Sequence, residues 1–416
     1  MSKHTSFLQK LGPGLLYAGA AIGVSHLVQS TRAGATFGLS MLLVVVLANF
    51  FKYPFFQYGP RYVAATGKSL LHGYKQLGNW AVWVFFLMTL GTMFIIQAAI
   101  TLVTAGLAAY IVGSEGSVLI WAIGVLILCS TLLISGRLEL LNKFMKIVMV
   151  ILALTTIAAA ISSIFTSEAQ TTLTSSFDFM NTEHVFFLIA FIGWMPAPID
   201  ISVWYSVWSE ANTKISGQSA DLKTGLFDFS VGYWGTAFLA LCFVILGTFM
   251  LHNSGIELSS SAVVFSSQII NAYTQTLGEW STPIISIAAF TTMLSTTISV
   301  LDGISRVLTP TFGYLRTNVP QEQEDKKSYR VWLTLLVLGS LITIWYFGKN
   351  MKSLVDFATS VSFLTAPILA YLNIRVIQSD QVSEPFKPTR FTQYISYIGL
   401  GLLILFSMIY LYFKWI

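Results

Sequence analysis

Charged residues are scarce in this chain. Only 10% of its 416 residues are Asp, Glu, Lys or Arg, whereas a soluble domain carries about 25%. Hydrophobic residues make up 55%, and the mean hydropathy is +0.72. This composition excludes a soluble enzyme or binding domain and indicates a protein that crosses a membrane many times. The net charge of +5 gives no support for nucleic-acid binding, because the basic residues fall mainly in short loops.

Cysteines and catalytic patterns are also lacking. The only two cysteines, Cys129 and Cys242, lie inside apolar segments, so neither a disulfide framework nor a metal cluster is predicted. No carboxylate pair, Ser-His-Asp order or HExxH motif is present. The Gly-Lys-Ser at 67–69 lacks the earlier glycine of a phosphate-binding loop, because Tyr62 stands at that position. We therefore predict neither an enzyme nor a protein with a bound cofactor.

What the sequence does contain is a series of apolar stretches, each long enough at about 20 residues to span a bilayer. They fall near 13–36, 39–65, 80–111, 117–135, 141–165, 184–208, 226–251, 282–306, 330–347, 352–377 and 392–413. The sequence therefore predicts an all-α integral membrane protein with eleven transmembrane helices, forming one transport domain over residues 1–416.

Loop charges predict how the helices are oriented. If the N-terminus is cytoplasmic, most loop Lys and Arg residues fall inside, among them Lys68, Lys75 and Arg316. The outside loops then hold acids such as Glu115 and Glu257. Cytoplasmic loops carry an excess of basic residues. We expect an integral protein of the plasma or inner membrane, with its N-terminus inside and its C-terminus outside.

The first and sixth stretches are interrupted in the middle, within 20–26 and 192–200. The break positions are Gly23, Val24, Ser25, Pro196, Ala197 and Pro198. Breaking a helix in hydrocarbon strands backbone N–H and C=O groups, at several kcal/mol each, so it is tolerated only where those groups line a site. Two such breaks in corresponding halves of a chain predict a substrate site between them.

The two halves of the chain also correspond. The first five stretches (12–165) and the next five (184–377) can be laid over each other, each half beginning with its broken helix. An odd number of spans per half inverts the second half in the membrane, which is the inverted-repeat plan of many secondary transporters. The stretch 392–413 is an additional helix.

Two ionisable residues near the breaks are candidate ligands. His26 and Asp200 each follow a break by about one turn, and an ionisable side chain inside a span is a functional candidate because a charge there costs about 3 kcal/mol. With the thioether of Met195 and freed backbone carbonyls, they would form a plausible transition-metal environment. The alternative is that both only form hydrogen bonds with neighbouring helices.

Three further acids are weaker candidates. Asp228 and Asp302 lie in the seventh and eighth stretches and are considered for ion coupling. Asp302 precedes Arg306 by four residues, which predicts an ion pair on one helix face. Asp356 lies near an interface, where it would be solvated.

Two basic residues, Lys52 and Arg61, lie in the second stretch. Long basic side chains in such places extend towards the interface or pair with an acid. We expect one of these two arrangements for each.

Several segments resemble the Nramp family of divalent-metal transporters. The resemblance rests on 12–16 (GPGLL), 32–35 (RAGA) and 65–70 (ATGKSL) in the first two spans, and on Met195-Pro196 at the second break. It implies a LeuT-like fold with inverted five-helix repeats and helices 1 and 6 broken at mid-membrane. It also implies transport of a divalent metal ion.

The resemblance places the family's metal site on residues that differ from its pattern. The family's first break, Asp-Pro-Gly-Asn, matches residues 23–26, so its Asp is replaced by Gly23 and its Asn by His26. Its Met is retained as Met195, but the following His is replaced by Ala197. The resemblance places two further metal ligands of the family at the backbone carbonyl of Ala20 and at Thr359. A second backbone carbonyl ligand is expected at Ile192. The acids of span 3 that are linked to proton movement have no counterpart in 80–111.

The sequence hypothesis is therefore a secondary transporter of divalent cations such as Mn or Fe, working by alternating access, with membrane lipid and the cation substrate as its partners. His26 and Asp200 would replace the lost ligands beside Met195, and H⁺ or Na⁺ would be the coupling ion. No nucleic acid and no obligate protein partner is expected.

Two alternatives remain open. Gly23 leaves more room and less negative charge at the first break, which would suit a small organic solute or amino acid. Such a transporter could be coupled to Na⁺ through hydroxyls of the eighth span at 295–297. The other alternative is a sensor or scaffold that transports nothing.

Overall fold

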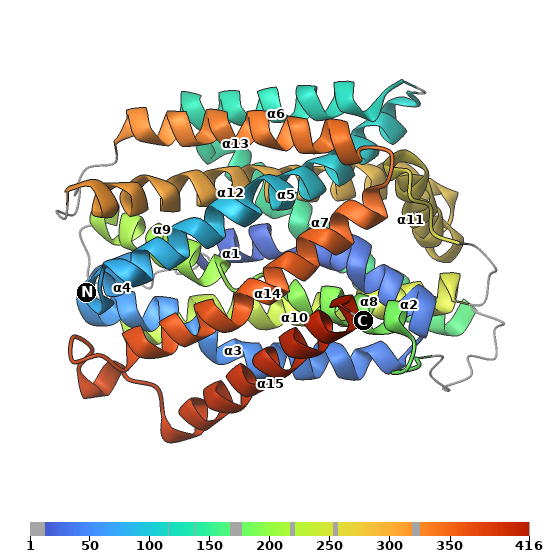
Figure 1. The fold of residues 1–416 in the computed structure, drawn as a ribbon. Coiled ribbons are helices and arrows are strands. Elements are labelled where there is room, and N and C mark those ends of the chain that lie inside the picture. The colour runs from blue at the N-terminus through green and yellow to red at the C-terminus, as the bar shows by residue number, and fades with distance from the viewer. Residues whose placement is uncertain are drawn as a thin grey trace, which may run out of the picture.

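Nearly all of the described chain is helical in the computed structural model (Figure 1). The structure describes residues 13–114, 116–136, 138–166, 177–216, 221–252, 257–317 and 325–415. Within these ranges, nine helices are long and apolar enough to cross a membrane. They lie in α3 (Ser40–Thr66), α5 (Asn79–Val112), α6 (Val118–Ser135), α7 (Leu138–Thr166), α10 (Leu222–Leu251), α12 (Thr282–Thr317), α13 (Lys326–Phe347), α14 (Met351–Ile377) and α15 (Arg390–Trp415).

The first and sixth predicted spans are each divided into shorter helices. The first consists of α1 (Pro13–Ala21), a π-helical turn η2 (Ser25–Ser30) and α2 (Thr31–Phe37). The sixth consists of α8 (Thr182–Gly193) and α9 (Ile201–Ser216), separated by residues 194–200. Both breaks are thus present. The total of eleven spans stays a prediction, because these divided segments fall short of an uninterrupted span.

The remaining elements connect the long helices. They are α4 (Leu70–Leu77), α11 (Ala262–Leu277) and the short turns η3 (Glu279–Ser281) and η4 (Glu384–Phe386). The α3 helix ends at Gly67, whose φ of 69° lies in the left-handed region that a residue without Cβ adopts at no steric cost.

The centre of the bundle holds the divided helices. In Figure 1, α1 lies in the interior, and it packs against α10, α12 and α9. In the apolar 18-residue stretches of α5 and of α12, 78% of the stretch is buried inside the protein, whereas in that of α15 only 17% is buried. Outer helices present large apolar side chains outward, such as Leu43, Ile120 and Ile342. In an integral membrane protein that surface faces lipid.

Glycines bring α10 into direct backbone contact with both halves of the first divided segment. A Cβ added to Gly14 would lie 2.2 Å from a backbone oxygen of α10, and one on Gly232 would lie 2.4 Å from a backbone oxygen of α1. On the other side of the break, a Cβ on Gly34 would lie 2.1 Å from α10 and one on Gly247 2.2 Å from α2. Small residues permit this close approach, and α1 and α2 are therefore both fixed to α10.

Candidate functional site

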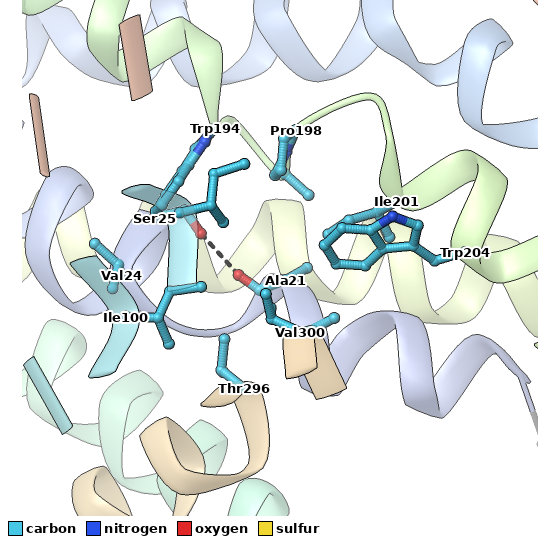
Figure 2. A pocket seen from close by; sticks show the side chains of 13 residues that line it. Ala21, Val24, Ser25, Ile100, Trp194, Pro198, Ile201, Trp204, Thr296 and Val300 are labelled. Atoms are coloured by element: carbon cyan, nitrogen blue, oxygen red, sulfur yellow. Dashed lines mark hydrogen bonds between the residues drawn. The ribbon is translucent and has the colours of Figure 1, made fainter. Parts of the chain in front are cut away.

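A small pocket lies where the two breaks meet (Figure 2). The space inside it that is open to the centre of a water molecule is about 20 Å³, which is room for about one water. Its lining comes from α1, the first break, α5, the second break, α9 and α12. The lining residues are Ala20, Ala21, Val24, Ser25, Ile96, Ile100, Trp194, Ala197, Pro198, Ile201, Trp204, Thr296 and Val300.

The lining is apolar, and none of its side chains is charged. Its polar groups are the hydroxyls of Ser25 and Thr296 and the indole N–H groups of Trp194 and Trp204. Among the described residues, neither indole N–H has a hydrogen-bond partner. A buried donor without a partner costs about 1–3 kcal/mol, and both indole nitrogens are buried in the walls of the pocket rather than exposed to its space.

Hydroxyl groups satisfy the carbonyls at the first break. Thr296 Oγ1 lies 2.9 Å from the carbonyl oxygen of Gly19 and 3.0 Å from that of Ile22. Ser25 Oγ donates to the carbonyl oxygen of Ala21 at 2.7 Å, as the dashed line in Figure 2 shows. A Cβ on Gly23 would lie 2.7 Å from Thr296 Cγ2. The absence of a side chain at Gly23 thus lets α12 reach the end of α1, rather than opening room for a ligand.

His26 faces α10 and does not line the pocket. Its Nε2 lies 2.9 Å from the carbonyl oxygen of Thr236, and its Nδ1 lies 2.8 Å from Ser25 Oγ. Because a carbonyl oxygen only accepts, Nε2 carries the hydrogen in that bond and offers no lone pair to a metal. The side chain is 0% exposed. The arrangement matches the alternative in which His26 forms hydrogen bonds with a neighbouring helix.

Met195 and Asp200 also lie outside the pocket lining. The Met195 side chain belongs to an apolar cluster with Phe37 and Val244. Asp200 directly precedes α9, and within the described part of the chain its Oδ1 has no hydrogen-bond partner. The three predicted ligands therefore do not converge in this structure. Across the described ranges, no group of three or more His, Cys, Asp or Glu residues could hold a metal ion.

The carbonyls of the second break are instead occupied by Lys52. Its Nζ donates to the carbonyl oxygens of Ile192 at 2.9 Å, Gly193 at 3.0 Å, Met195 at 3.0 Å and Ala197 at 3.1 Å. The Ile192 carbonyl, predicted as a metal ligand, is thus already bound. Lys52 is 2% exposed and its ammonium is bound by carbonyl oxygens, so the prediction that it extends to the interface or pairs with an acid is wrong. We infer that the four stranded carbonyls attract the ammonium more strongly than the distant interface does.

Of the other predicted positions, some line the pocket and some do not. Ala20, Val24, Ala197 and Pro198 line the pocket, whereas Pro196 does not. Pro196 follows the cis peptide bond of the second break.

Thr359 lies outside the pocket as well. Its Oγ1 donates to the carbonyl oxygen of Val355 at 2.9 Å, within its own helix. Its backbone oxygen lies against Gly193, where an added Cβ would be 2.4 Å away. Thr359 therefore fixes the distance between α14 and α8 rather than contributing to the pocket.

Asp228 and Asp302 have structural partners. Asp228 Oδ2 accepts from the backbone N–H of Gly14 at 2.7 Å, at the start of α1. Asp302 and Arg306 form the ion pair predicted from their spacing, at 2.9 Å. Asp302 also accepts from Trp208 Nε1 and the Tyr329 hydroxyl, both at 2.9 Å. Asp302 therefore connects α12 to α9 and α13.

Replacing this carboxylate separates a structural role from ion coupling. We expect Asp302→Asn to lower the free energy of unfolding by about 2–3 kcal/mol, because removing one partner of a largely buried pair leaves Arg306 uncompensated. Transport per folded molecule should be unchanged. Thermal unfolding of the purified protein, together with uptake normalised to folded protein, measures both quantities. Wild-type stability with lost ion dependence would assign Asp302 to coupling instead.

A second ion pair was not predicted. Arg32 on α2 donates to both carboxylate oxygens of Asp356 on α14, at 2.7 and 2.9 Å, and Gln29 Nε2 donates to the same carboxylate at 3.1 Å. The expectation that Asp356 is merely solvated is wrong, because the guanidinium of a residue 324 positions away covers it. The bidentate pair joins the second half of the first divided segment to the second repeat.

Comparison with known proteins gives matches along the whole chain. A family model described as natural resistance-associated macrophage protein-like, or Nramp, matches residues 14–413. An uncharacterised protein of Pasteurella multocida (strain Pm70) is 34% identical over 418 residues, covering 98% of this chain and 93% of that protein.

Many solved structures share the fold, among them the following two. A manganese transporter of Eremococcus coleocola, in complex with an aromatic bis-isothiourea substituted compound, matches with a TM-score of 0.69 and 13% identity over 98% of this chain and 88% of the other. MhsT in complex with L-phenylalanine matches with a TM-score of 0.68 and 14% identity, over 98% of this chain and 100% of the other. At such low identity these matches establish the LeuT-like fold alone.

Proposed function

The chain belongs to the Nramp family, and we propose on that premise that it is a secondary transporter that moves a small substrate by alternating access at the pocket between its two breaks. The observation that carries this proposal is the shared pocket, to which α1, α9 and both breaks contribute. Paired broken helices around a central site are the usual substrate site of such folds. The helices α1, α2, α3, α8, α9 and α10 would move against the rest.

Transport of a metal ion is the activity that family membership and the likeness to a manganese transporter support. In its finer form, the proposal is a divalent ion such as Mn²⁺ or Fe²⁺ bound by His26, Met195 and Asp200. That ligand set requires a rearrangement from the present structure. His26 would have to release the Thr236 carbonyl, and Met195 would have to leave its apolar cluster.

The lining of the pocket favours a second candidate, a small organic solute. No charged side chain lines the space, and its surface is almost wholly apolar. At about 20 Å³ the pocket is too small for an organic solute, so a solute would fit only when the moving helices separate from α5 and α12. In this proposal the substrate is recognised by the shape of the apolar pocket rather than by ligation.

The two candidates are distinguished by binding measured on the purified protein. A ligand that binds the folded state raises its apparent stability, by about 2.7 kcal/mol at one hundred times its Kd. The protein is screened with Mn²⁺, Mg²⁺, Na⁺ and a panel of amino acids and small organic acids, and each stabilising compound is then tested for uptake into proteoliposomes. If no compound of either class is taken up, the transport proposal fails.

Filling the pocket tests its role directly. Val24 is 1% exposed and lines the space, so Val24→Phe should reduce uptake of the identified substrate to background because the larger side chain occupies the site. Uptake is measured per molecule of folded protein. The matched control is Val46→Phe on α3, where Val46 is 50% exposed on the outer surface. Wild-type uptake by a folded Val24→Phe protein would place the substrate elsewhere.

A further inference from the structure

The end of α8 forms a cage of backbone oxygens around one side-chain nitrogen. Four carbonyl oxygens, from Ile192, Gly193, Met195 and Ala197, lie 2.9–3.1 Å from Lys52 Nζ. They stand at the C-terminal end of a helix, where the helix dipole places partial negative charge. Unwound carbonyls at the end of a half-helix are the groups with which folds of this kind coordinate cations. The cage thus has the form of a cation site, with an ammonium inside it.

The geometry requires the charged form of the amine. An ammonium has three N–H donors and no lone pair, so all three hydrogens can be directed at the four carbonyl oxygens, with one hydrogen shared between two of them. A neutral amine would direct a lone pair at a carbonyl oxygen. Lys52 lies on α3 and reaches the cage from there, 140 positions before Ile192 in the chain. Lys52 is 2% exposed. Water therefore cannot replace it without a rearrangement of α3 against α8.

A carboxylate lies within electrostatic reach of this ammonium. Asp200 follows Ala197, the last cage residue, by three positions, and the charge of an ionised Asp200 would favour the ammonium form of Lys52. An ionised Asp200 would balance the one positive charge that the break already holds. A second cation placed on the same carbonyls would be repelled by Lys52 and would find no further anion among the lining residues.

We propose that Lys52 is a resident cation, which permanently fills the carbonyl cage in place of a transported or coupling ion, so that the substrate is an uncharged or anionic organic solute. This inference rests on the proposed transport function. It assigns two roles to parts of one site. The cage is satisfied by the protein itself, and recognition falls to the apolar pocket beside it, to which the cage residue Ala197 also contributes.

Replacing the ammonium tests whether it acts as a cation or only as a helix cap. Lys52→Met retains the length of the chain but not the charge, and we expect its melting temperature to fall by several degrees. Added ethylammonium chloride or Na⁺ should then restore part of the loss, at concentrations where choline chloride of equal ionic strength does not. The wild-type protein should show no such specific response. Lys223→Met is the matched control, because Lys223 is exposed on α10.

Direct binding separates this inference from the transport proposal. Radiolabelled Na⁺ should bind Lys52→Met protein but not wild type, and radiolabelled Mn²⁺ should not bind wild type in a saturable manner. Saturable uptake of Mn²⁺ by wild type would support transport and overturn the resident cation. If Lys52→Met does not fold, the wild-type measurements still test the proposal. Stabilisation of the wild-type protein by a metal ion contradicts the proposal. Stabilisation by an organic solute alone supports it. A lack of any uptake would refute the transport proposal. The rescue of Lys52→Met by ethylammonium would still test whether Lys52 acts as a cation in the cage.

Discussion

Gly247→Ala should destabilise this protein more than any other single methyl group added to α10. The new Cβ would lie 2.2 Å from the carbonyl oxygen of Thr31, and a backbone atom cannot turn aside as a side chain can. The helices would have to separate by more than 1 Å, and overpacking of this kind costs roughly 3 kcal/mol or more. We expect a large fall in melting temperature in detergent and a loss of transport.

The same helix provides the control. Gly235 has no atom within 4 Å of its added Cβ, so Gly235→Ala should be neutral or stabilising by up to about 1 kcal/mol, because alanine is the better helix former. Gly34→Ala, on the facing helix, should reproduce the effect of Gly247→Ala. Equal melting temperatures for Gly247→Ala and Gly235→Ala would mean that α2 and α10 are not in contact in the folded protein.

Breaking the pair between Arg32 and Asp356 should have the second largest effect, this time on transport. The pair connects α2, which moves in the proposed cycle, to α14, which does not, so it must form and break once per cycle. The side chains of Arg32 and Asp356 are 10% and 36% exposed, so the pair is partly screened and its strength is modest. Even 1.4 kcal/mol changes a conformational population about tenfold. We therefore expect Arg32→Ala and Asp356→Asn each to lower uptake about tenfold.

A charge exchange distinguishes pairing from other effects. Arg32→Asp combined with Asp356→Arg should recover part of the uptake that either change alone removes. Lys387→Ala is the control, because Lys387 pairs with Glu384 at 2.9 Å on the surface and Glu384 is 84% exposed, where such pairs contribute little. Independent, additive losses in the double variant would show that the two residues do not act through each other.

The architecture could be predicted because few physical rules govern it. A membrane span needs a minimum apolar length, and a break in it leaves stranded backbone groups, so hydropathy and a few residues at 20–26 and 192–200 were enough to locate the divided helices. The pair of Asp302 and Arg306 could be predicted for a similar reason, since a spacing of four places two residues on one helical face.

The orientation of side chains at the breaks could not be predicted. His26 lies in η2, a π-helical turn, and such a turn shifts the phase of the helix, so the direction of a side chain beyond Gly23 cannot be counted from α1. Met195 follows the end of α8, where no period applies. The partners of Lys52 and Asp356 lie 140 and 324 positions away, and nothing in one sequence indicates contacts of that separation.

The two breaks also differ in the point of synthesis at which the side chain that binds their stranded carbonyls has been made. The carbonyls that end α1 are bound by Thr296, which lies 277 positions after Gly19. The carbonyls that end α8 are bound by Lys52, which is made 140 positions before Ile192. The second break can therefore be closed as soon as it leaves the ribosome and enters the bilayer. The first remains incomplete until Thr296 has been made, after about seven tenths of the 416 residues, so the N-terminal segment must wait in the membrane with stranded carbonyls for most of synthesis.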